Sequence, residues 1–86
     1  MTMVKLYVSP QCPKCEALKK VMKDMGVEYE VLDVSKSDVM ADLIMRDIFL
    51  IETPGLEVDG KFFHARELFD GDRLILEKLR KVLGRE

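Results

Sequence analysis

Two cysteines separated by two residues constrain this chain more than any other feature of its sequence. The motif Cys12-Pro13-Lys14-Cys15 follows a β-branched and aromatic run at residues 3–8 and opens a helical pattern. The run predicts a buried strand, and a loop is expected at residues 9–11. Cys12 is then expected at the N-cap of a helix and Pro13 at its first position, with Gly26 as the stop. The apolar residues that recur on this helix at spacings of three and four are Cys15, Leu18, Val21, Met22 and Met25.

This placement predicts different chemistry for the two cysteines. At the N-cap, Cys12 meets unpaired backbone N–H groups and the positive end of the helix dipole, and Lys14 adds a nearby cation. The pKa of Cys12 is therefore expected between about 3.5 and 7.5, below the value of about 8.5 for a free thiol. Cys15 lies on the apolar face and is expected to be shielded. The sequence thus predicts that Cys12 attacks a disulfide and Cys15 resolves the product, while Pro13 fixes one backbone angle between them.

The rest of the chain predicts alternating strands and helices. Strands are expected at residues 28–34, 55–58 and 61–64, with Pro54 before the third strand and the hairpin signal Asp59-Gly60 before the fourth. The first two strands should be parallel, because a helix joins them, and the last two antiparallel. The expected fold is α/β, with a central four-stranded mixed sheet flanked by about three helices. The 86 residues are expected to form a single domain over residues 1–86.

The later helices are expected to bury one face each. Ser35 or Ser37 is the expected cap of a second helix, a helical turn is expected at residues 66–69, and Asp72 is the expected cap of a last helix that Gly84 closes. The second helix should bury Val39, Met40, Leu43, Ile44 and Ile48 and leave Asp38, Asp42, Arg46 and Asp47 in water; the last should bury Leu76, Leu79, Val82 and Leu83.

Composition restricts the partners and the compartment. The 14 basic and 16 acidic residues are mixed along the chain and give a net charge of −2, so no nucleic acid or membrane surface is expected as a partner. No apolar run approaches the roughly 20 residues of a membrane span, and residues 1–5 lack the pattern of a secretory signal. A cytoplasmic, reducing location is therefore expected. In that setting, a Cys-x-x-Cys motif within a strand-helix-strand pattern indicates redox activity.

Metal binding is the alternative function of the two cysteines. A zinc site needs about four ligands, and only His64 offers a third of the Cys/His type. A zinc or iron–sulfur site would therefore require a dimer sharing two cysteine pairs. We expect a monomer without a metal, and we expect His64 to face solvent or to cap the last hairpin. Because Phe62 and Phe63 are neighbours on a strand, one of them is expected to leave the core and to offer a docking contact near Pro54.

The chain resembles the glutaredoxin branch of the thioredoxin-fold family over nearly its whole length. The resemblance rests on residues 7–15, on Thr53-Pro54, and on the Asp59-Gly60 hairpin with its terminal helix. It implies a thioredoxin fold, activity as a protein-disulfide reductase, and a cis peptide bond between Thr53 and Pro54 beside the cysteines. It also implies that Thr53 and Pro54 bind the substrate, with the Thr53 backbone pairing to an extended segment.

Several positions depart from the usual glutaredoxin pattern. Ser9 stands where the family usually has the Lys or Arg that meets glutathione, and residues 63–67 lack the Gly-Gly pair, leaving Glu67 as the acidic residue. Leu6 stands where thioredoxins have a buried Asp. The resemblance implies a small dithiol carrier like those that pass electrons to ribonucleotide reductase and are recharged by a thioredoxin reductase-like enzyme. No cofactor is expected beyond the reversible Cys12–Cys15 disulfide, and a glutathione-dependent glutaredoxin is the alternative.

Overall fold

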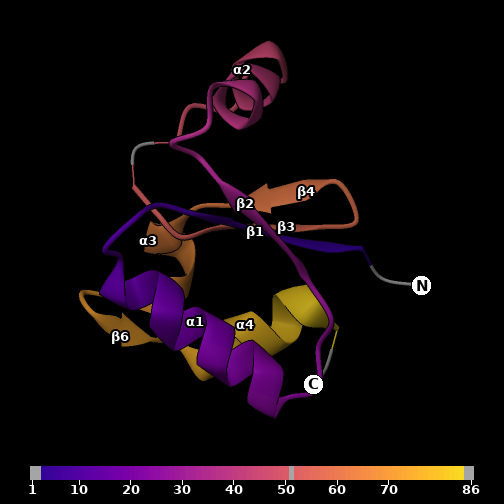
Figure 1. Cartoon of the computed structure of the whole chain (residues 1–86). Helices are drawn as coiled ribbons and strands as arrows, with labels where there is room; N and C mark the ends of the chain where they lie inside the picture. The colour runs from indigo at the N-terminus through magenta and orange to yellow at the C-terminus, as the bar shows by residue number, and fades with distance from the viewer. Residues whose placement is uncertain (1–2, 51, 85–86) are drawn as a thin grey trace.

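The protein forms a four-stranded mixed sheet with helices on both faces, as a computed structural model describes it for residues 3–50 and 52–84 (Figure 1). α1 and α4 lie on one side of the sheet and α2 on the other. The elements in chain order are β1 (Val4–Val8), α1 (Pro13–Asp24), β2 (Glu30–Asp33), α2 (Ser37–Met45), β3 (Gly55–Val58), β4 (Lys61–Phe63), α3 (Ala65–Leu68), β5 (Phe69–Asp70), β6 (Arg73–Leu74) and α4 (Leu76–Leu83).

The main sheet has the strand order β2-β1-β3-β4. β1 runs parallel to β2 and antiparallel to β3, and β3 runs antiparallel to β4. Asp59 and Gly60 both have positive φ, as the tight hairpin between β3 and β4 requires. The predicted α/β fold with a four-stranded mixed sheet is confirmed. Since Tyr7 is paired with Gly55, the loop after β1 and the segment before β3 meet at the same edge of the sheet.

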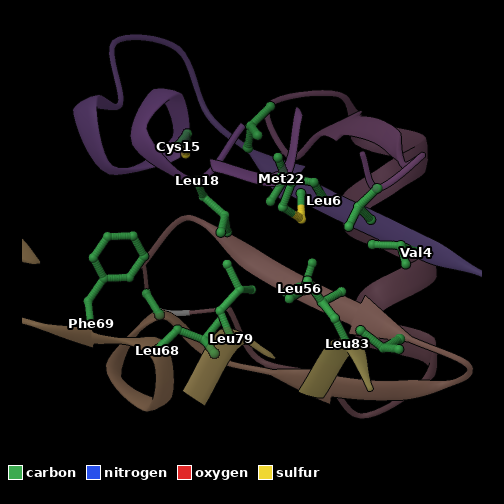
Figure 2. Close-up of a cluster of buried hydrophobic side chains, with 14 residues drawn as sticks. Val4, Leu6, Cys15, Leu18, Met22, Leu56, Leu68, Phe69, Leu79 and Leu83 are labelled. Atoms are coloured by element: carbon green, nitrogen blue, oxygen red, sulfur yellow. The ribbon is translucent and has the colours of Figure 1, made fainter. Parts of the chain in front are cut away.

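Alternate residues of the central strands build the main core. Leu6 and Leu56 have no exposed surface and face the helices α1 and α4 (Figure 2). Leu18 and Met22 of α1 and Leu79 of α4 complete this cluster. Because this core includes Cys15 as well, it fixes the start of α1 against the sheet. This layer forms because successive strand side chains point to opposite faces of the sheet and because the apolar residues of α1 recur with the helical period.

The opposite face of the sheet carries an ionic cluster of Tyr7, Arg46 and Glu57. Glu57 is 7% exposed, and its Oε1 accepts hydrogen bonds from Arg46 Nη2 at 2.7 Å and from the Tyr7 hydroxyl at 3.1 Å. Arg46 stays exposed, as expected, but its guanidinium also compensates the charge of the buried carboxylate, which was not predicted. Burial and the charge of Glu57 raise the pKa of Tyr7, against a lowering hydrogen bond from Arg46. The hydrogen bond to Glu57 raises the pKa of Arg46.

Helix α2 buries less of its apolar face than its sequence pattern predicts. Leu43 is fully buried, whereas Ile44 is 51% exposed, so the expectation of a fully buried face is wrong. The expected Ser35 or Ser37 cap is also wrong. The N-cap is Lys36, and Ser37 is already helical. Hydrogen bonding from Ser35 lowers the pKa of Asp33, which accepts the Ser35 backbone N–H at 2.9 Å.

A second hairpin precedes the last helix. Phe69 pairs with Leu74 across the strands β5 and β6, and Gly71 turns between them with a φ of +62°. Asp72 lies in this turn, so its predicted role as the cap of α4 is wrong; the N-cap is Ile75. Gly84 ends α4 in a left-handed conformation, as predicted.

Two further findings concern the helices. In α4, Leu79 and Leu83 are buried as expected, but Leu76 is 47% exposed. The predicted helical turn is α3, which begins one residue earlier than expected.

Within residues 3–50 and 52–84, every helix is too short or too polar to cross a membrane.

Candidate active site

Cys12 is the N-cap residue of α1, as the sequence predicts. Its backbone is extended, with φ −116° and ψ 98°, and Pro13 is the first helical residue. The backbone N–H of Cys15 donates a hydrogen bond to Cys12 Sγ at 3.1 Å. The sulfur therefore takes the place that a side-chain oxygen has in an ordinary N-cap. Unpaired N–H groups and the helix dipole at this position stabilise a thiolate.

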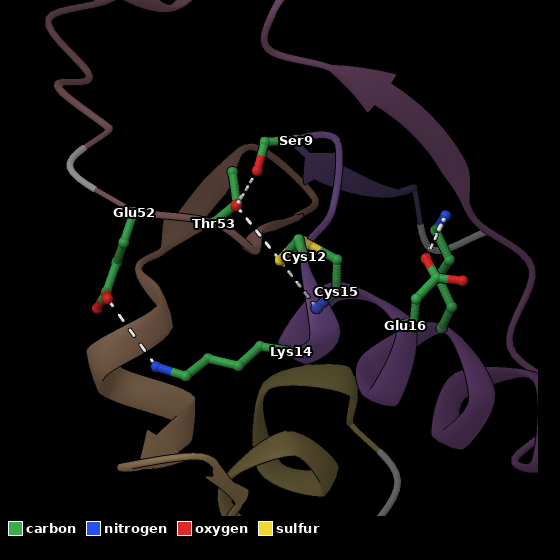
Figure 3. The surroundings of a disulfide bond; sticks show 8 residues. Ser9, Cys12, Lys14, Cys15, Glu16, Glu52 and Thr53 are labelled. Atoms are coloured by element: carbon green, nitrogen blue, oxygen red, sulfur yellow. Dashed lines mark hydrogen bonds and ion pairs between the residues drawn. A yellow bond between two sulfur atoms is a disulfide. The ribbon is translucent and has the colours of Figure 1, made fainter.

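The two cysteines form a disulfide across the first turn of α1 (Figure 3). Their Cα atoms lie 5.2 Å apart, within the usual range for such a bond. Cys15 is 1% exposed and packs in the core, whereas Cys12 keeps part of its surface open to solvent. An incoming molecule can thus reach one sulfur of the pair and not the other.

Thr53 and Pro54 lie beside Cys12, although Cys12 and Thr53 are 41 residues apart in sequence. The peptide bond between Thr53 and Pro54 is cis, and Pro54 is fully buried. The Thr53 hydroxyl donates a hydrogen bond to Cys12 Sγ at 3.4 Å. The pairing of β1 with β3 brings these segments together at the same edge of the sheet. The structure therefore brings together the four residues Cys12, Cys15, Thr53 and Pro54 that the sequence places in the site.

Lys14 crosses the site toward Glu52. Its Nζ lies 4.0 Å from Glu52 Oε2 (Figure 3). The same atom lies 5.8 Å from the centroid of the Phe69 ring, so the ammonium lies between a carboxylate and an aromatic face. Glu52 offsets part of the charge of Lys14. The sequence analysis missed Glu52, although its position directly before Thr53-Pro54 was a signal that it lies near the motif.

Ser9 is a second residue whose contact the sequence analysis missed. Its hydroxyl lies 2.6 Å from the Thr53 hydroxyl, so Ser9, Thr53 and Cys12 form a chain of polar contacts. The sequence analysis treated Ser9 only as a replacement for a cation. Its position three residues before Cys12, together with a hydroxyl residue before Pro54, was the available signal.

The contacts at the end of β4 are not those expected for a glutathione-binding site or for a fully exposed aromatic side chain. Glu67 Oε2 accepts a hydrogen bond from the backbone N–H of His64 at 2.7 Å, so Glu67 caps the N-terminus of α3. His64 is the N-cap of α3, and its ring lies 5.0 Å from that of Phe62. One of the two phenylalanines leaves the main core, as expected: Phe63 packs against that core, whereas Phe62 packs against Tyr7 on the other face of the sheet. Phe62 is half-buried there, so the expected exposed docking contact is not formed.

The described residues do not assemble a metal site. Among residues 3–50 and 52–84, no three His, Cys, Asp or Glu side chains are grouped so that they could hold an ion.

Known structures share this fold. The thioredoxin-like protein BC3987 is 28% identical to this chain and superposes with a TM-score of 0.71 over 93% of this chain and 99% of its own. The glutaredoxin-like NrdH-redoxin of Escherichia coli is 19% identical and has a TM-score of 0.60 over 72% of this chain and 80% of its own. Glutaredoxin 1 of Francisella tularensis is 15% identical, with a TM-score of 0.57 over 74% and 83%. The last two likenesses show a common fold.

Sequence comparison gives the family directly. No curated protein matches the chain. The glutaredoxin family profile matches residues 4–63, which include β1, the Cys-x-x-Cys motif, Thr53-Pro54 and the β3–β4 hairpin. The chain therefore belongs to the glutaredoxin family and is a thiol–disulfide oxidoreductase.

Proposed function

We propose that the chain is a dithiol electron carrier that reduces disulfides of partner proteins through Cys12 and Cys15. The observation that carries this proposal is the asymmetry of the two sulfurs at the start of α1. Cys12 is partly exposed and accepts the Cys15 backbone N–H, whereas Cys15 is 1% exposed. The accessible sulfur is the one that the helix stabilises as a thiolate, which is the nucleophile in disulfide exchange.

The reaction has two exchange steps. The Cys12 thiolate attacks one sulfur of the substrate disulfide, forms a mixed disulfide with it, and expels the other substrate sulfur as a thiolate that takes up a proton. Cys15 then loses its proton and attacks Cys12 Sγ, which releases the second substrate sulfur. Two electrons pass to the substrate, and the carrier is left with the Cys12–Cys15 disulfide.

We assign Thr53 and Pro54 to substrate binding. Thr53 lies beside Cys12 and is half-buried, and its backbone leads into the buried Pro54 directly before β3. An extended segment of the substrate pairs with the Thr53 backbone, as strand addition does at other sheet edges. This pairing holds the substrate disulfide near Cys12.

A thioredoxin reductase-like enzyme is the proposed electron donor, and a ribonucleotide reductase is the kind of target that this carrier serves. Two observations favour this donor over glutathione. Ser9 stands where a cation usually meets the tripeptide, and its hydroxyl is engaged with Thr53. Glu67, the acidic residue that remains near the end of β4, is bound to the start of α3.

The two cysteine variants test the proposed mechanism. Cys12→Ser should abolish reduction of insulin disulfides, because no thiolate is left to attack. Cys15→Ser should form the mixed disulfide but fail to release it, so that mass spectrometry under non-reducing conditions finds a covalent substrate adduct on Cys12. Full turnover by Cys12→Ser contradicts the mechanism.

Recycling assays test the electron donor separately. The oxidised protein is offered NADPH with thioredoxin reductase in one assay, and glutathione with glutathione reductase in the other. Faster reduction in the first assay is expected. Faster reduction in the second would make the chain a glutathione-dependent glutaredoxin while leaving the roles of Cys12 and Cys15 unchanged.

A further inference from the structure

We propose that Ser9 is a positioning residue of the redox reaction: its hydroxyl orients the Thr53 hydroxyl so that the latter donates a hydrogen bond to the Cys12 thiolate. This inference rests on the proposed role of Cys12 as the attacking sulfur. It gives the side chains of Ser9 and Thr53 a part in setting the reactivity of the site, in addition to the backbone role of Thr53 in substrate binding.

The direction of the two hydrogen bonds follows from counting protons. A threonine hydroxyl has one proton, and Thr53 donates it to Cys12 Sγ over 3.4 Å. The 2.6 Å contact between Thr53 Oγ1 and Ser9 Oγ must then be donated by Ser9, whose own proton points to Thr53. Ser9 therefore holds the Thr53 hydroxyl in the orientation in which it donates a hydrogen bond to Cys12 Sγ. Donation along such a chain strengthens each bond through mutual polarisation.

Reduction increases the importance of this chain. In the disulfide, Cys12 Sγ is a weak neutral acceptor, whereas in the thiolate it carries a full negative charge. A hydrogen bond to a charged group is roughly twice as strong as one between neutral groups. The sulfur then has two protein donors, the Cys15 backbone N–H at 3.1 Å and the Thr53 hydroxyl. The backbone donor is present in any helix start, but the hydroxyl donor depends on Ser9 and Thr53.

The two hydroxyls thereby influence both the rate and the driving force. Stabilising the thiolate lowers the pKa of Cys12 and makes more of the nucleophile available near neutral pH. The same stabilisation favours the reduced form of the carrier, which makes the Cys12–Cys15 disulfide more oxidising. Removing the hydroxyls should therefore raise the thiol pKa and make the carrier a stronger reductant.

The test measures the pKa of Cys12 in the reduced protein from the pH dependence of its alkylation by iodoacetamide. Thr53→Val removes the hydroxyl with little change in shape and should raise the pKa by about one unit. Ser9→Ala should raise it by a smaller amount, because the Thr53 hydroxyl remains but is no longer oriented. Ser9→Thr keeps a hydroxyl at this position and should leave the Cys12 pKa at the wild-type value. Ser37→Ala, at the exposed start of α2, is the control and should leave the pKa unchanged.

A second readout separates tuning from a structural effect. At a pH below both pKa values, an increase of one unit should slow alkylation about threefold, because the more basic thiolate is also the better nucleophile. The equilibrium with a glutathione redox buffer should shift toward the disulfide form in Thr53→Val and Ser9→Ala. At a pH above both pKa values, a rise of one unit should shift this equilibrium about tenfold, which corresponds to about 30 mV.

An unchanged Cys12 pKa in Ser9→Ala would overturn the inference, even if Thr53→Val raised the pKa. If Thr53→Val does not fold, Ser9→Ala alone tests the inference, because Ser9→Ala only shortens a side chain in a loop. Failure of the proposed function has a different signature, because it would appear as insulin reduction by Cys12→Ser whatever the pKa values of the hydroxyl variants.

Discussion

Lys14 and Glu52 set the charge beside Cys12. The Lys14 ammonium lies 4.0 Å from the Glu52 carboxylate, and both side chains are partly exposed. We propose that Lys14 favours the thiolate of Cys12 through its positive charge and that Glu52 opposes this effect by pairing with Lys14. The net influence on Cys12 therefore depends on both residues.

Opposite changes in the pKa of Cys12 are expected when these charges are removed singly. Lys14→Met should raise the pKa and Glu52→Gln should lower it, each by about 0.3 unit, because solvent screens partly exposed charges. Alkylation kinetics of the reduced variants over a pH series measure both values. The shifts should shrink in high salt. A lower pKa in Lys14→Met would show that Lys14 does not stabilise the thiolate.

Single-residue predictions from the sequence succeeded where local chemistry decides the outcome. The capping position of Cys12 and the burial of Cys15 follow from the helical period and from Pro13 at the first position. The contacts of Ser9 and Glu52 did not follow, because they depend on how two segments far apart in sequence meet across β1 and β3. Only the register of these strands brings the hydroxyls within 2.6 Å of each other.

At the level of elements, α2 is attached to the sheet by one buried leucine and one ion pair. Leu43 packs without exposed surface, and Arg46 at the end of the helix reaches the buried Glu57. The chain continues from this anchor toward Thr53. The ion pair therefore anchors the end of α2 to β3.

Breaking this ion pair should destabilise the fold. Arg46→Met leaves the Glu57 carboxylate buried without its cation and should lower the free energy of unfolding by about 2 kcal/mol; the effect is moderate because Arg46 keeps some exposure. The double variant Arg46→Met/Glu57→Met should lose less than the sum of the two single variants. Urea unfolding measures these values, with Arg73→Met on the exposed β6 as the control. Additive losses would contradict the coupling.

Tyr7 gives this cluster a pH dependence. Burial raises the pKa of its phenol in the folded protein, so the fold favours the neutral form. The resulting stability is complete below the ordinary tyrosine pKa of about 10 and is lost as the pH rises through the higher folded value. Urea unfolding should therefore show a decline in stability above about pH 10 that is smaller in Tyr7→Phe. Equal declines in both proteins would contradict this assignment.

Elements with a clear hydrophobic period were predictable, and those without one were not. The strands β1 and β3 and the helix α1 bury regular sets of side chains, and the sequence indicated each of them. β5 and β6 have two residues each, too few to show an alternation, so Asp72 was assigned to a helix cap. The apolar pattern of α2 suggested burial, but the sheet presents Tyr7 and Glu57 on this face, and Arg46 at the end of α2 pairs with them.

The chain has one pair of cysteines, and the two functions considered for this pair require different numbers of copies of the chain. Dithiol exchange needs a single copy of the chain, whereas a metal or cluster site would need two copies that share their Cys12 and Cys15 thiolates. Protein purified without oxygen is expected to sediment as a monomer and to contain no stoichiometric iron or zinc. Elemental analysis with analytical ultracentrifugation measures both properties. A dimer holding iron or zinc that is lost in Cys12→Ser would favour the metal-binding alternative.

The fold makes the two sulfurs differ in their exposure and in the stabilisation of a negative charge. The core between the sheet and the helices α1 and α4 holds Cys15, and the start of α1 projects Cys12 to the surface beside Thr53-Pro54. Access and charge stabilisation therefore coincide at one atom, Cys12 Sγ. The proposed role as an electron carrier depends on that coincidence.

Alkylation of the reduced protein by a limiting amount of iodoacetamide, followed by mapping of the label with mass spectrometry over a pH series, tests this point most directly. The label is expected on Cys12 alone at about pH 7, with an apparent pKa below about 7.5. Equal labelling of Cys15, or an apparent Cys12 pKa near the free-thiol value of about 8.5, would contradict the proposed role of Cys12.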